Sequence, residues 1–366
     1  MELRSLGLLI SCTLVKNSMA KLSVQLVSWN GAKYVPALFE SLKGQTYKDW
    51  KLHVWDNGSE DGMVKEMEAY AEALPMTMYK NEKNLGFAGG HNALYKKGAG
   101  EYMLLLNQDM HLHPNLFEQL VTFLDTHKEY DAVSPRLMKW NFSLMAEDHI
   151  PFEKICTSQV DSLGLQVYKN RRVTDLHTTK DWKELHKEMP AEVLPVFGLS
   201  GALPMYRTKA IDDVAFSDGN MFDELYVSYK EDVDLAYRLA SAGKKSAIVL
   251  KAVAHHDRSA AGPVKKDDFT AAKNKRSQSS WVQYHSYKNH LITLYKNEYW
   301  QNGLLDALPV IWYEGKKFVY LLFTHPKVIS GLGVCVRNYG SIRKRRKEIT
   351  AKRQLSWKQM RIYWNT

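Results

Sequence analysis

Residues 101–109 read EYMLLLNQD, a run of apolar residues that ends on the polar triplet NQD. Two earlier segments share this design. Residues 21–29, KLSVQLVSW, are followed by an Asn-Gly pair, and residues 50–55, WKLHVW, are followed by the turn-forming sequence DNGS. Short apolar runs that are rich in β-forming residues and stop at turn residues predict β-strands. Each of these three predicted strands therefore ends in polar side chains.

Helices are predicted between the strands, because apolar residues recur there at helical spacing. Strands that alternate with helices predict an α/β protein whose mostly parallel sheet is covered on both faces. Ligands of such sheets bind at the carboxyl ends of the strands, so the three polar strand ends predict one pocket. The other predicted elements are a helix with Tyr34, Leu38 and Leu42, a helix capped by Ser59 that carries Val64, Met67, Tyr70 and Ala71, a strand at Thr77–Lys80, a helix over residues 86–98, a helix with Leu116, Leu120 and Phe123, and a strand around Ala132–Ser134.

The alternation breaks over residues 140–195. Within this region the charged stretch 169–192 is predicted to be an excursion or a flexible loop. Regular elements are predicted again after it, namely a segment over residues 196–206, a helix over residues 231–243, a strand over residues 246–254 that runs into His255 and His256, and a long amphipathic helix over residues 274–299.

The composition is that of a globular protein, with 45% hydrophobic and 25% charged residues among 366, which excludes fibrous and wholly disordered classes. The cysteines, Cys12, Cys156 and Cys335, are far apart, so a zinc cluster is excluded and a disulfide framework is not expected. This usage fits a reducing compartment. The apolar segment Ser5–Val15 resembles a signal peptide without a cleavage site, and Met19 is the preferred start of translation.

The net charge of +10 is concentrated at one end of the chain. Residues 337–366 contain ten Lys and Arg against the single acid Glu348, a local charge of +9, which leaves +1 for residues 1–336. The positive charge therefore has a local role.

No segment reaches the roughly 18–20 uncharged apolar residues that a membrane-spanning helix needs.

Three motifs could carry chemistry, and each also has a plain structural interpretation. Residues 84–92, NLGFAGGHN, could place glycines and a helix N-terminus near anionic oxygens, or could form a tight turn. Asp109 could hold a divalent cation against a diphosphate, or could cap the helix that begins near Pro114. The pair His255-His256 could supply a metal ligand, or could satisfy local hydrogen bonds.

The sequence Glu231-Asp232-Val233-Asp234 opens a predicted helix. Carboxylates in the first turn suit the helix dipole, which is a sufficient structural reason for all three. Glu231 and Asp234 are three residues apart and share a face, whereas Asp232 points elsewhere. An acid that begins a helix beside a pocket could also serve as a general base.

Taken in order, these motifs resemble the family-2 glycosyltransferases of the rhamnosyltransferase-like type, and the resemblance covers roughly residues 21–297. One such motif would be weak, but seven in register are specific. The matching stretches are Val27–Asn30, Trp55–Gly62, Asn84–Asn92, Leu105–Asp109, Gly198–Ala202 leading to Tyr206-Arg207, Phe222–Glu224, and Tyr229–Leu235.

The resemblance implies a GT-A fold, in which a Rossmann-like half that binds the nucleotide-diphospho-sugar is joined to an acceptor half, here with a C-terminal helical extension. It also implies the site residues. Catalysis is assigned to Asp232, the family's base, with Glu231 beside it. The donor pocket is assigned to Ser28, Asn30, Asp56, Asn84, Gly86, Asn92 and Asn107, the metal site to Asp109 and His256, and the acceptor side to Gly201 and Ala202.

The implied reaction is an inverting transfer of a sugar, first of all rhamnose, from a nucleotide-diphosphate donor to a hydroxyl of a glycan or lipid-linked glycan. The implied cofactor is Mg²⁺ or Mn²⁺, which offsets the charge that builds on the leaving diphosphate. Asn107 stands where the family's metal-binding motif has its first acid, which is a departure from the two-carboxylate form. The alternative function is that of a catalytically silent protein that binds nucleotide sugars or glycans on the same fold.

The domain organisation predicted from these observations has four parts: an N-terminal extension over residues 1–20, a catalytic domain over 21–260, a closing helix over 261–300, and an apolar and basic tail over 301–366. The tail could contact an anionic membrane surface, or could be a helical subdomain with a solvated surface. Without a recognised binding module, nucleic acid is not an expected partner. The predicted location is cytoplasmic, peripheral on the inner face of the cell membrane.

Overall fold

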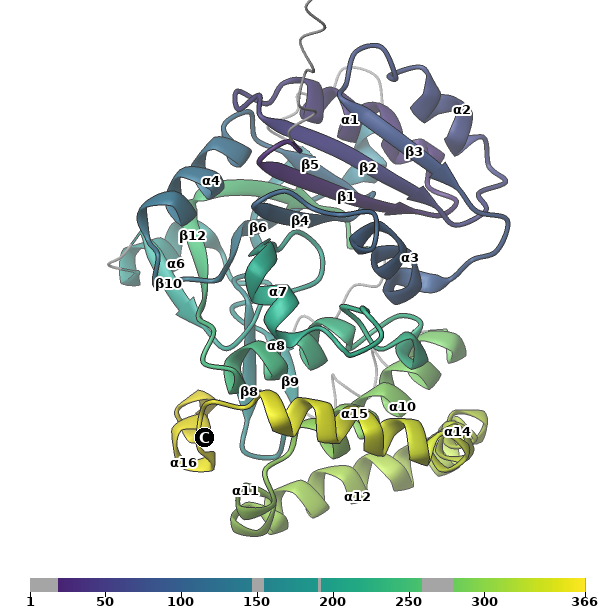
Figure 1. The fold of residues 1–366 in the computed structure, drawn as a ribbon, viewed down its shortest axis with the longest axis vertical. Coiled ribbons are helices and arrows are strands. Elements are labelled where there is room, and N and C mark those ends of the chain that lie inside the picture. The colour runs from purple at the N-terminus through teal and green to yellow at the C-terminus, as the bar shows by residue number, and fades with distance from the viewer. Residues whose placement is uncertain (1–18, 147–154, 190–191, 259–278, 366) are drawn as a thin grey trace, which may run out of the picture.

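The computed structural model describes residues 19–146, 155–189, 192–258 and 279–365 (Figure 1). Most of the predicted N-terminal extension, including Cys12, lies outside the described residues, as does the stretch 261–278 of the predicted closing helix. Cys156 and Cys335 lie among the described residues, and both are partly exposed.

The first half of the chain has the predicted alternation of strands and helices. The strand β4 is buried on both faces, with Leu104 and Leu106 in one core and Met103 and Leu105 in the other. A strand buried in this way needs helices on both sides of the sheet. The elements are β1 (Leu22–Ser28), α1 (Val35–Lys43), β2 (Trp50–Asp56), α2 (Met63–Glu68), β3 (Met76–Lys80), α3 (Gly86–Tyr95), β4 (Tyr102–Leu106), β5 (Met110–Leu112), α4 (Leu116–Thr126) and β6 (Ala132–Trp140).

The main sheet has the strand order β10-β12-β6-β11-β4-β1-β2-β3, with β5 against β12 and β7 against β6. Strand β1 is parallel to both β2 and β4, and β6 is parallel to β12, as predicted for the core of the sheet. The strands β5, β7, β10 and β11 are antiparallel, so the second half is mixed. The later elements are β7 (Cys156–Ser162), β10 (Val193–Val196), β11 (Met205–Arg207), α7 (Thr208–Val214), α8 (Glu231–Ser241) and β12 (Ser246–His256).

Two local predictions are wrong. The stretch 169–192 is not a loop, because it contains the strand β9 (Val173–Asp175) and the helix α6 (Trp182–Glu188). Strand β9 pairs with β8 (Leu165–Tyr168), and its surface position explains the charged residues that obscured it. Ser59 does not cap a helix either: α2 begins after Gly62, and the Ser59 hydroxyl donates to Asp56 instead.

The C-terminal region is a helical layer at the end of the molecule opposite β1–β3 (Figure 1). No described helix is long and apolar enough to cross a membrane. A strand, β13 (Trp364–Asn365), returns to pair with β8 and completes a second sheet, β13-β8-β9. The helices are α10 (Ser280–Asn297), α11 (Trp300–Leu305), α12 (Ala307–Thr324), α13 (Pro326–Ile329), α14 (Gly331–Arg337), α15 (Tyr339–Lys352) and α16 (Trp357–Met360).

Much of the basic tail is folded against the rest of the chain rather than free in solvent. Arg345 pairs with Asp218, while the Arg346 and Arg353 guanidinium groups donate to backbone carbonyls at the end of α10. Exposed basic groups remain at Arg343, Lys344 and Lys347 on α15. The C-terminal region is thus a helical extension with part of its positive charge exposed.

Candidate active site

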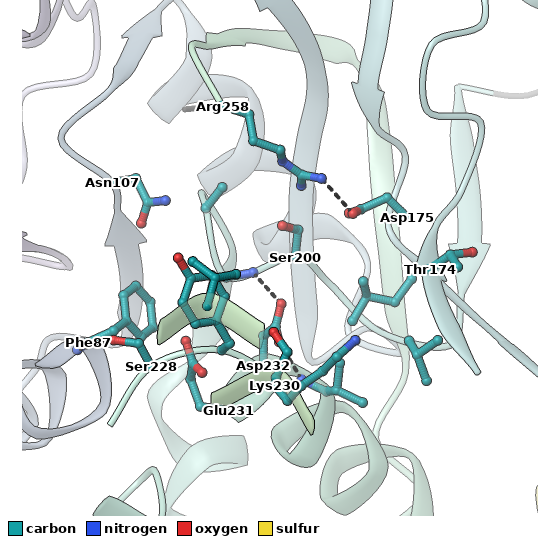
Figure 2. A pocket seen from close by; sticks show the side chains of 18 of the residues that line it. Phe87, Asn107, Thr174, Asp175, Ser200, Ser228, Lys230, Glu231, Asp232 and Arg258 are labelled. Carbon is teal, nitrogen blue, oxygen red and sulfur yellow. Dashed lines mark hydrogen bonds and ion pairs between the residues drawn. The ribbon is translucent and has the colours of Figure 1, made fainter. Parts of the chain in front are cut away.

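A cavity of about 560 Å³ opens where β4, β12 and the beginning of α8 converge. Figure 2 shows Glu231 and Asp232 on one side of it, with Arg258 and Asp175 on the other. The cavity brings together residues that lie far apart in the sequence. Seven of the predicted site residues line it, namely Asn107, Asp109, Gly201, Ala202, Glu231, Asp232 and His256.

His256 lies between two carboxylates. Its Nε2 is 3.3 Å from Oδ1 of Asp109, and its Nδ1 is 2.9 Å from Oδ2 of Asp161 on β7. Burial alone would lower the pKa of His256, but the two carboxylates raise it to about 10. Burial likewise opposes the charge on Asp161, yet Arg258 and His256 hold the pKa of that carboxyl below its ordinary value. Asp109 is thus joined to a buried network of charges.

This arrangement fits a divalent cation. At a pKa of about 10 the His256 ring carries protons on both nitrogens at neutral pH. A cation would displace the proton of Nε2, whose lone pair then lies beside Asp109 while Nδ1 still donates to Asp161, and ligating histidines in proteins are commonly supported by a carboxylate in this way. No cluster of three or more His, Cys, Asp or Glu side chains that could hold a metal occurs among the described residues. A cation with one or two protein ligands and the phosphates of a substrate matches the habit of Mg²⁺.

Asp232 is held at the beginning of α8 by two backbone amides. The amide of Gly201 donates to its Oδ2 at 3.2 Å, and the amide of Val233 donates to its Oδ1 at 2.7 Å. Burial raises its pKa, although Lys230 and these amides oppose the shift. The Gly201 amide can approach because its residue has no side chain: an added Cβ would lie 3.4 Å from that of Asp232. The carboxylate is therefore fixed in position and more basic than that of an ordinary aspartate.

Glu231 is 7% exposed, and its Oε2 has no hydrogen-bond partner in the part of the chain that the structure describes. Burial, together with the charge of Asp232, raises the pKa of Glu231 well above its ordinary value. A buried polar atom without a partner is unfavourable, because the group has lost its hydration. This oxygen is available to a ligand in the cavity.

The loop that leads into α8 is strained. Val227, Tyr229 and Lys230 all have positive φ angles near 63–71°, which residues other than glycine rarely adopt. Asn289 of α10 is fully buried beneath them, with Nδ2 within 2.7–2.9 Å of the carbonyl oxygens of Tyr226, Ser228 and Tyr229. Helix α10 thus holds the loop in the conformation that presents the two acids to the cavity.

The predicted donor residues at the ends of β1 and β2 lie together, though not among the residues that line the cavity. Ser28 donates to Asp56 at 3.1 Å, and both oxygens of Asp56 accept hydrogen bonds from the turn that follows it. The side-chain oxygen of Asn30 accepts from the amide of Glu60 in that same turn. The polar ends of these two strands are thus one hydrogen-bonded unit, whereas of the three strand ends predicted to form one pocket only that of β4 lines this cavity.

The glycine-rich stretch 84–92 lies against the strained loop before α8. Asn84 accepts from the amide of Gly86 within the turn, and Gly86 has φ +72° with no room for a side chain beside the carbonyl of Val227. Asn92 is buried and bonds the backbone of Phe222 with both ends of its amide, so it supports the fold beside the site. The stretch meets the cavity itself through Phe87.

Several residues of the site were not predicted from the sequence. The far wall of the cavity is built by β9 and the turns around it, with Arg172, Thr174, Asp175 and Thr178, and by Arg258 after β12. Arg258 pairs with Asp175 at 2.8 Å and with Asp161 at 3.4 Å. All but Arg258 belong to the region 140–195, where neither periodicity nor a motif marked them. Asn289 gave no signal because a buried Asn in a long helix resembles a surface residue.

Comparison with known proteins identifies the fold. Residues 23–179 match the family model described as glycosyl transferase family 2. The chain is 27% identical over 124 residues to the putative glycosyltransferase EpsE of Bacillus subtilis (strain 168), an alignment that covers 33% of this chain and 45% of EpsE. It is 31% identical over 112 residues to an uncharacterized glycosyltransferase of Haemophilus influenzae, covering 31% of this chain and 37% of that protein. The matches thus span less than half the length of either relative.

Among solved structures, the crystal structure of GalNAc-T7 with UDP, GalNAc and Mn²⁺ superposes with a TM-score of 0.55 at 14% identity, over 76% of this chain and 48% of that one. This likeness is one of fold. The chain therefore has the GT-A fold with added C-terminal helices, and its residues 23–179 resemble family 2 glycosyltransferases. Both predictions are confirmed.

Proposed function

We propose that this protein is an inverting glycosyltransferase that moves a sugar from a nucleotide-diphosphate donor to a hydroxyl of an acceptor. The observation that carries the proposal is the cavity that Asp232 lines together with the pair of Asp109 and His256. A base and a cation site on one cavity are what a single displacement at an anomeric carbon requires. A binding protein would need neither a desolvated carboxylate nor the network behind His256.

Asp232 takes the proton of the acceptor hydroxyl as that oxygen attacks the anomeric carbon. The bond from this carbon to the diphosphate oxygen breaks on the opposite face, and the absence of a covalent step gives inversion. The two backbone amides keep the carboxylate oriented, while its burial makes it a better base. Glu231, with its unpartnered oxygen, binds a hydroxyl of one of the two sugars.

Asp109 and His256 hold a Mg²⁺ or Mn²⁺ ion, with Asp161 fixing the histidine ring from behind. Such an ion stabilises the negative charge that builds on the leaving diphosphate. Asn107, beside Asp109 in the cavity, supplies an amide where a second acid is absent. The crystals of GalNAc-T7 contain both UDP and Mn²⁺, which supports a metal-assisted reaction on this fold.

The nucleoside is placed at the edge formed by Ser28, Asn30 and Asp56, and the rest of the donor extends along the loop of Asn84 and Gly86, which Asn92 supports. The acceptor approaches past Gly201 and Ala202. The far wall, with Arg172, Thr174 and Thr178, is then the acceptor side of the cavity. Rhamnose is the first sugar to test, with a glycan or lipid-linked glycan as acceptor. Such a reaction would build a polysaccharide or glycolipid from the cytoplasmic face of the cell membrane.

Release of nucleoside diphosphate from a panel of nucleotide sugars tests the proposal. One donor is expected to be hydrolysed slowly when Mg²⁺ or Mn²⁺ is present, and chelation should stop the reaction. Calorimetry with the same donors is the companion measurement. Binding of a donor without any release, even with candidate acceptors added, would favour the silent binding protein. Absence of both binding and release would refute the assignment.

The two adjacent histidines provide a matched test of the metal site. His256→Ala is expected to raise the metal concentration needed for half-maximal activity by roughly tenfold or more. His255→Ala changes a neighbour of equal burial whose ring stacks on His113 instead of facing Asp109, so it should leave the metal requirement unchanged. Equal responses of the two variants would show that His256 is not a metal ligand.

The dependence of the rate on pH should report the environment of Asp232. A general base works only when it is ionised, so kcat/KM falls as the pH drops through the pKa of this carboxyl. Because burial raises that pKa, the fall should occur at a higher pH than an ordinary aspartate would give. A pH–rate profile of the wild-type enzyme measures it. A rate that stays constant down to the range of an exposed aspartate would contradict the assignment.

A further inference from the structure

Helix α12 presents apolar side chains to solvent along one stripe, which we term its outer face. The exposed residues are spaced three, four or seven positions apart, so they share one side of the helix. Gly315, which falls within the stripe, has open space where a side chain would be. The outer face comprises Leu308 (83% exposed), Ile311 (69%), Trp312 (69%), Val319 (51%), Leu322 (43%) and Phe323 (81%).

The inner side of α12 carries the polar contacts. Glu314 lies 2.6 Å from Nε2 of His290 on α10, and the Lys317 ammonium lies over the ring of Tyr287. Leu321 is the fully buried apolar residue of the helix. A surface helix of a soluble protein has the reverse arrangement, with its apolar stripe towards the core and its charges towards water. Helix α12 is apolar on its outer face as well as around Leu321, so the outer face is suited to contact something apolar.

The apolar surface continues onto the helix before α12. Trp300, Leu304 and Leu305 of α11 are 62–69% exposed. The junction between the two helices is rigid, since Asp306 is bonded to the fully buried Arg171 and to Arg361. Arg171 precedes the strand that forms the far wall of the cavity. Whatever binds the outer face is thereby held at a fixed orientation to the cavity.

The charges around the outer face select one kind of occupant. Residues 300–366 contain thirteen Lys and Arg but only three acids. Each of the acids is turned inward and bonded: Asp306 to Arg171, Glu314 to His290, and Glu348 to Ser217 and Arg345. The exposed charges of this layer are therefore positive, and Lys316 stands beside Trp312 on the outer face itself. Such a surface is complementary to anionic lipid headgroups.

We propose that the outer face of α12, with the exposed residues of α11, inserts into the interface of an anionic phospholipid membrane. An amphipathic helix of this kind lies in the plane of the bilayer with its apolar side at the headgroup boundary, where Trp is favoured. The basic residues of α15 strengthen the attraction but are not the inserted element. The inference rests on the exposure of α12 and not on the proposed catalytic activity.

Cosedimentation of the full chain with vesicles tests the inference. The wild-type protein should bind phosphatidylcholine vesicles that contain phosphatidylglycerol, and bind pure phosphatidylcholine more weakly. The double variant Ile311→Asp, Phe323→Asp should lose roughly tenfold or more in affinity, because two inserted apolar groups become charged. Ile362→Asp makes the same change at a residue of similar exposure outside α11 and α12, and should bind as the wild type does.

Two results would overturn the inference. Retention of vesicle binding by the double variant would show that α12 is not the inserted element. A wild-type dimer in light scattering without lipid, absent in the double variant, would show that the outer face joins two copies of the chain. Donor hydrolysis in solution, measured on the same preparations, reports the catalytic proposal separately, because the substitutions lie outside the cavity.

Discussion

Asp232→Asn is expected to lower the turnover number by roughly 10³-fold, within the range that a general base contributes. Asparagine keeps the size of the aspartate but only one acceptor oxygen, so one of the two bonds from the amides of Gly201 and Val233 can persist and the other is lost. The capacity to take a proton is lost in either orientation of the amide. Since the donor is bound by other residues, its affinity should change little.

Nucleoside diphosphate release under saturating donor gives the turnover, and calorimetry of the donor gives the affinity. Asp212→Asn, the same substitution at an exposed site on α7, is the control and should behave as the wild type does. Turnover that survives in Asp232→Asn would mean that another group is the base. Loss of donor affinity together with turnover would show that Asp232 acts in donor binding and not in proton transfer.

Arg171→Met is expected to lower the free energy of unfolding by about 3 kcal/mol, the cost of leaving buried charges without their partner. The guanidinium is fully buried, bonds Glu298 at 2.6 and 3.0 Å and Asp306 at 3.0 Å, and lies over the ring of Trp364. It joins the hairpin of β8 and β9 to the helices α10–α12. Methionine fills most of the space but leaves the two carboxylates unmatched on this side.

Denaturant unfolding followed by circular dichroism measures the change. Lys80→Met removes the cation of the exposed pair with Glu68 and should cost no more than about 0.5 kcal/mol. If the two variants unfolded at the same denaturant concentration, Arg171 would not be a structural link. A variant of Arg171 that is as stable as the wild type, yet inactive, would give this residue a direct role in the reaction instead.

The parallel core of the sheet could be predicted because each of its strands can be recognised from its own short run of apolar residues. EYMLLL at residues 101–106 is apolar almost throughout, and both faces of this strand are buried. The polar ends of β1 and β2 also follow from the pattern, and Ser28 lies beside Asp56 as the register requires. The acids before α8 could be singled out from the resemblance, and they line the cavity together with Asp109.

The far side of the cavity could not be predicted, since its contacts join distant segments. Asp161 is buried against His256, 95 positions later, and it lies in the region 140–195, where the alternation of strands and helices breaks. Asn289 can bond three carbonyl oxygens of the loop 226–230 only because that loop adopts unusual backbone angles, and no residue type in the loop predicts those angles. The apolar residues of the outer face of α12 are evident in the sequence. Whether they face solvent or the core depends on which side of the helix α10 covers, and the sequence does not show this.

The pairing of β8 with β13 has a consequence for the order in which the protein can fold. Val167 meets Trp364 about 200 residues later, and at the usual speed of translation the ribosome needs roughly 10–40 s to add that length of chain. During this interval one edge of β8 has no partner strand, and until Glu298 and Asp306 have been added Arg171 lacks both of its carboxylates. A strand edge left open in this way invites pairing with other chains. We therefore expect the nascent protein to depend on chaperones more than its parallel core alone would require.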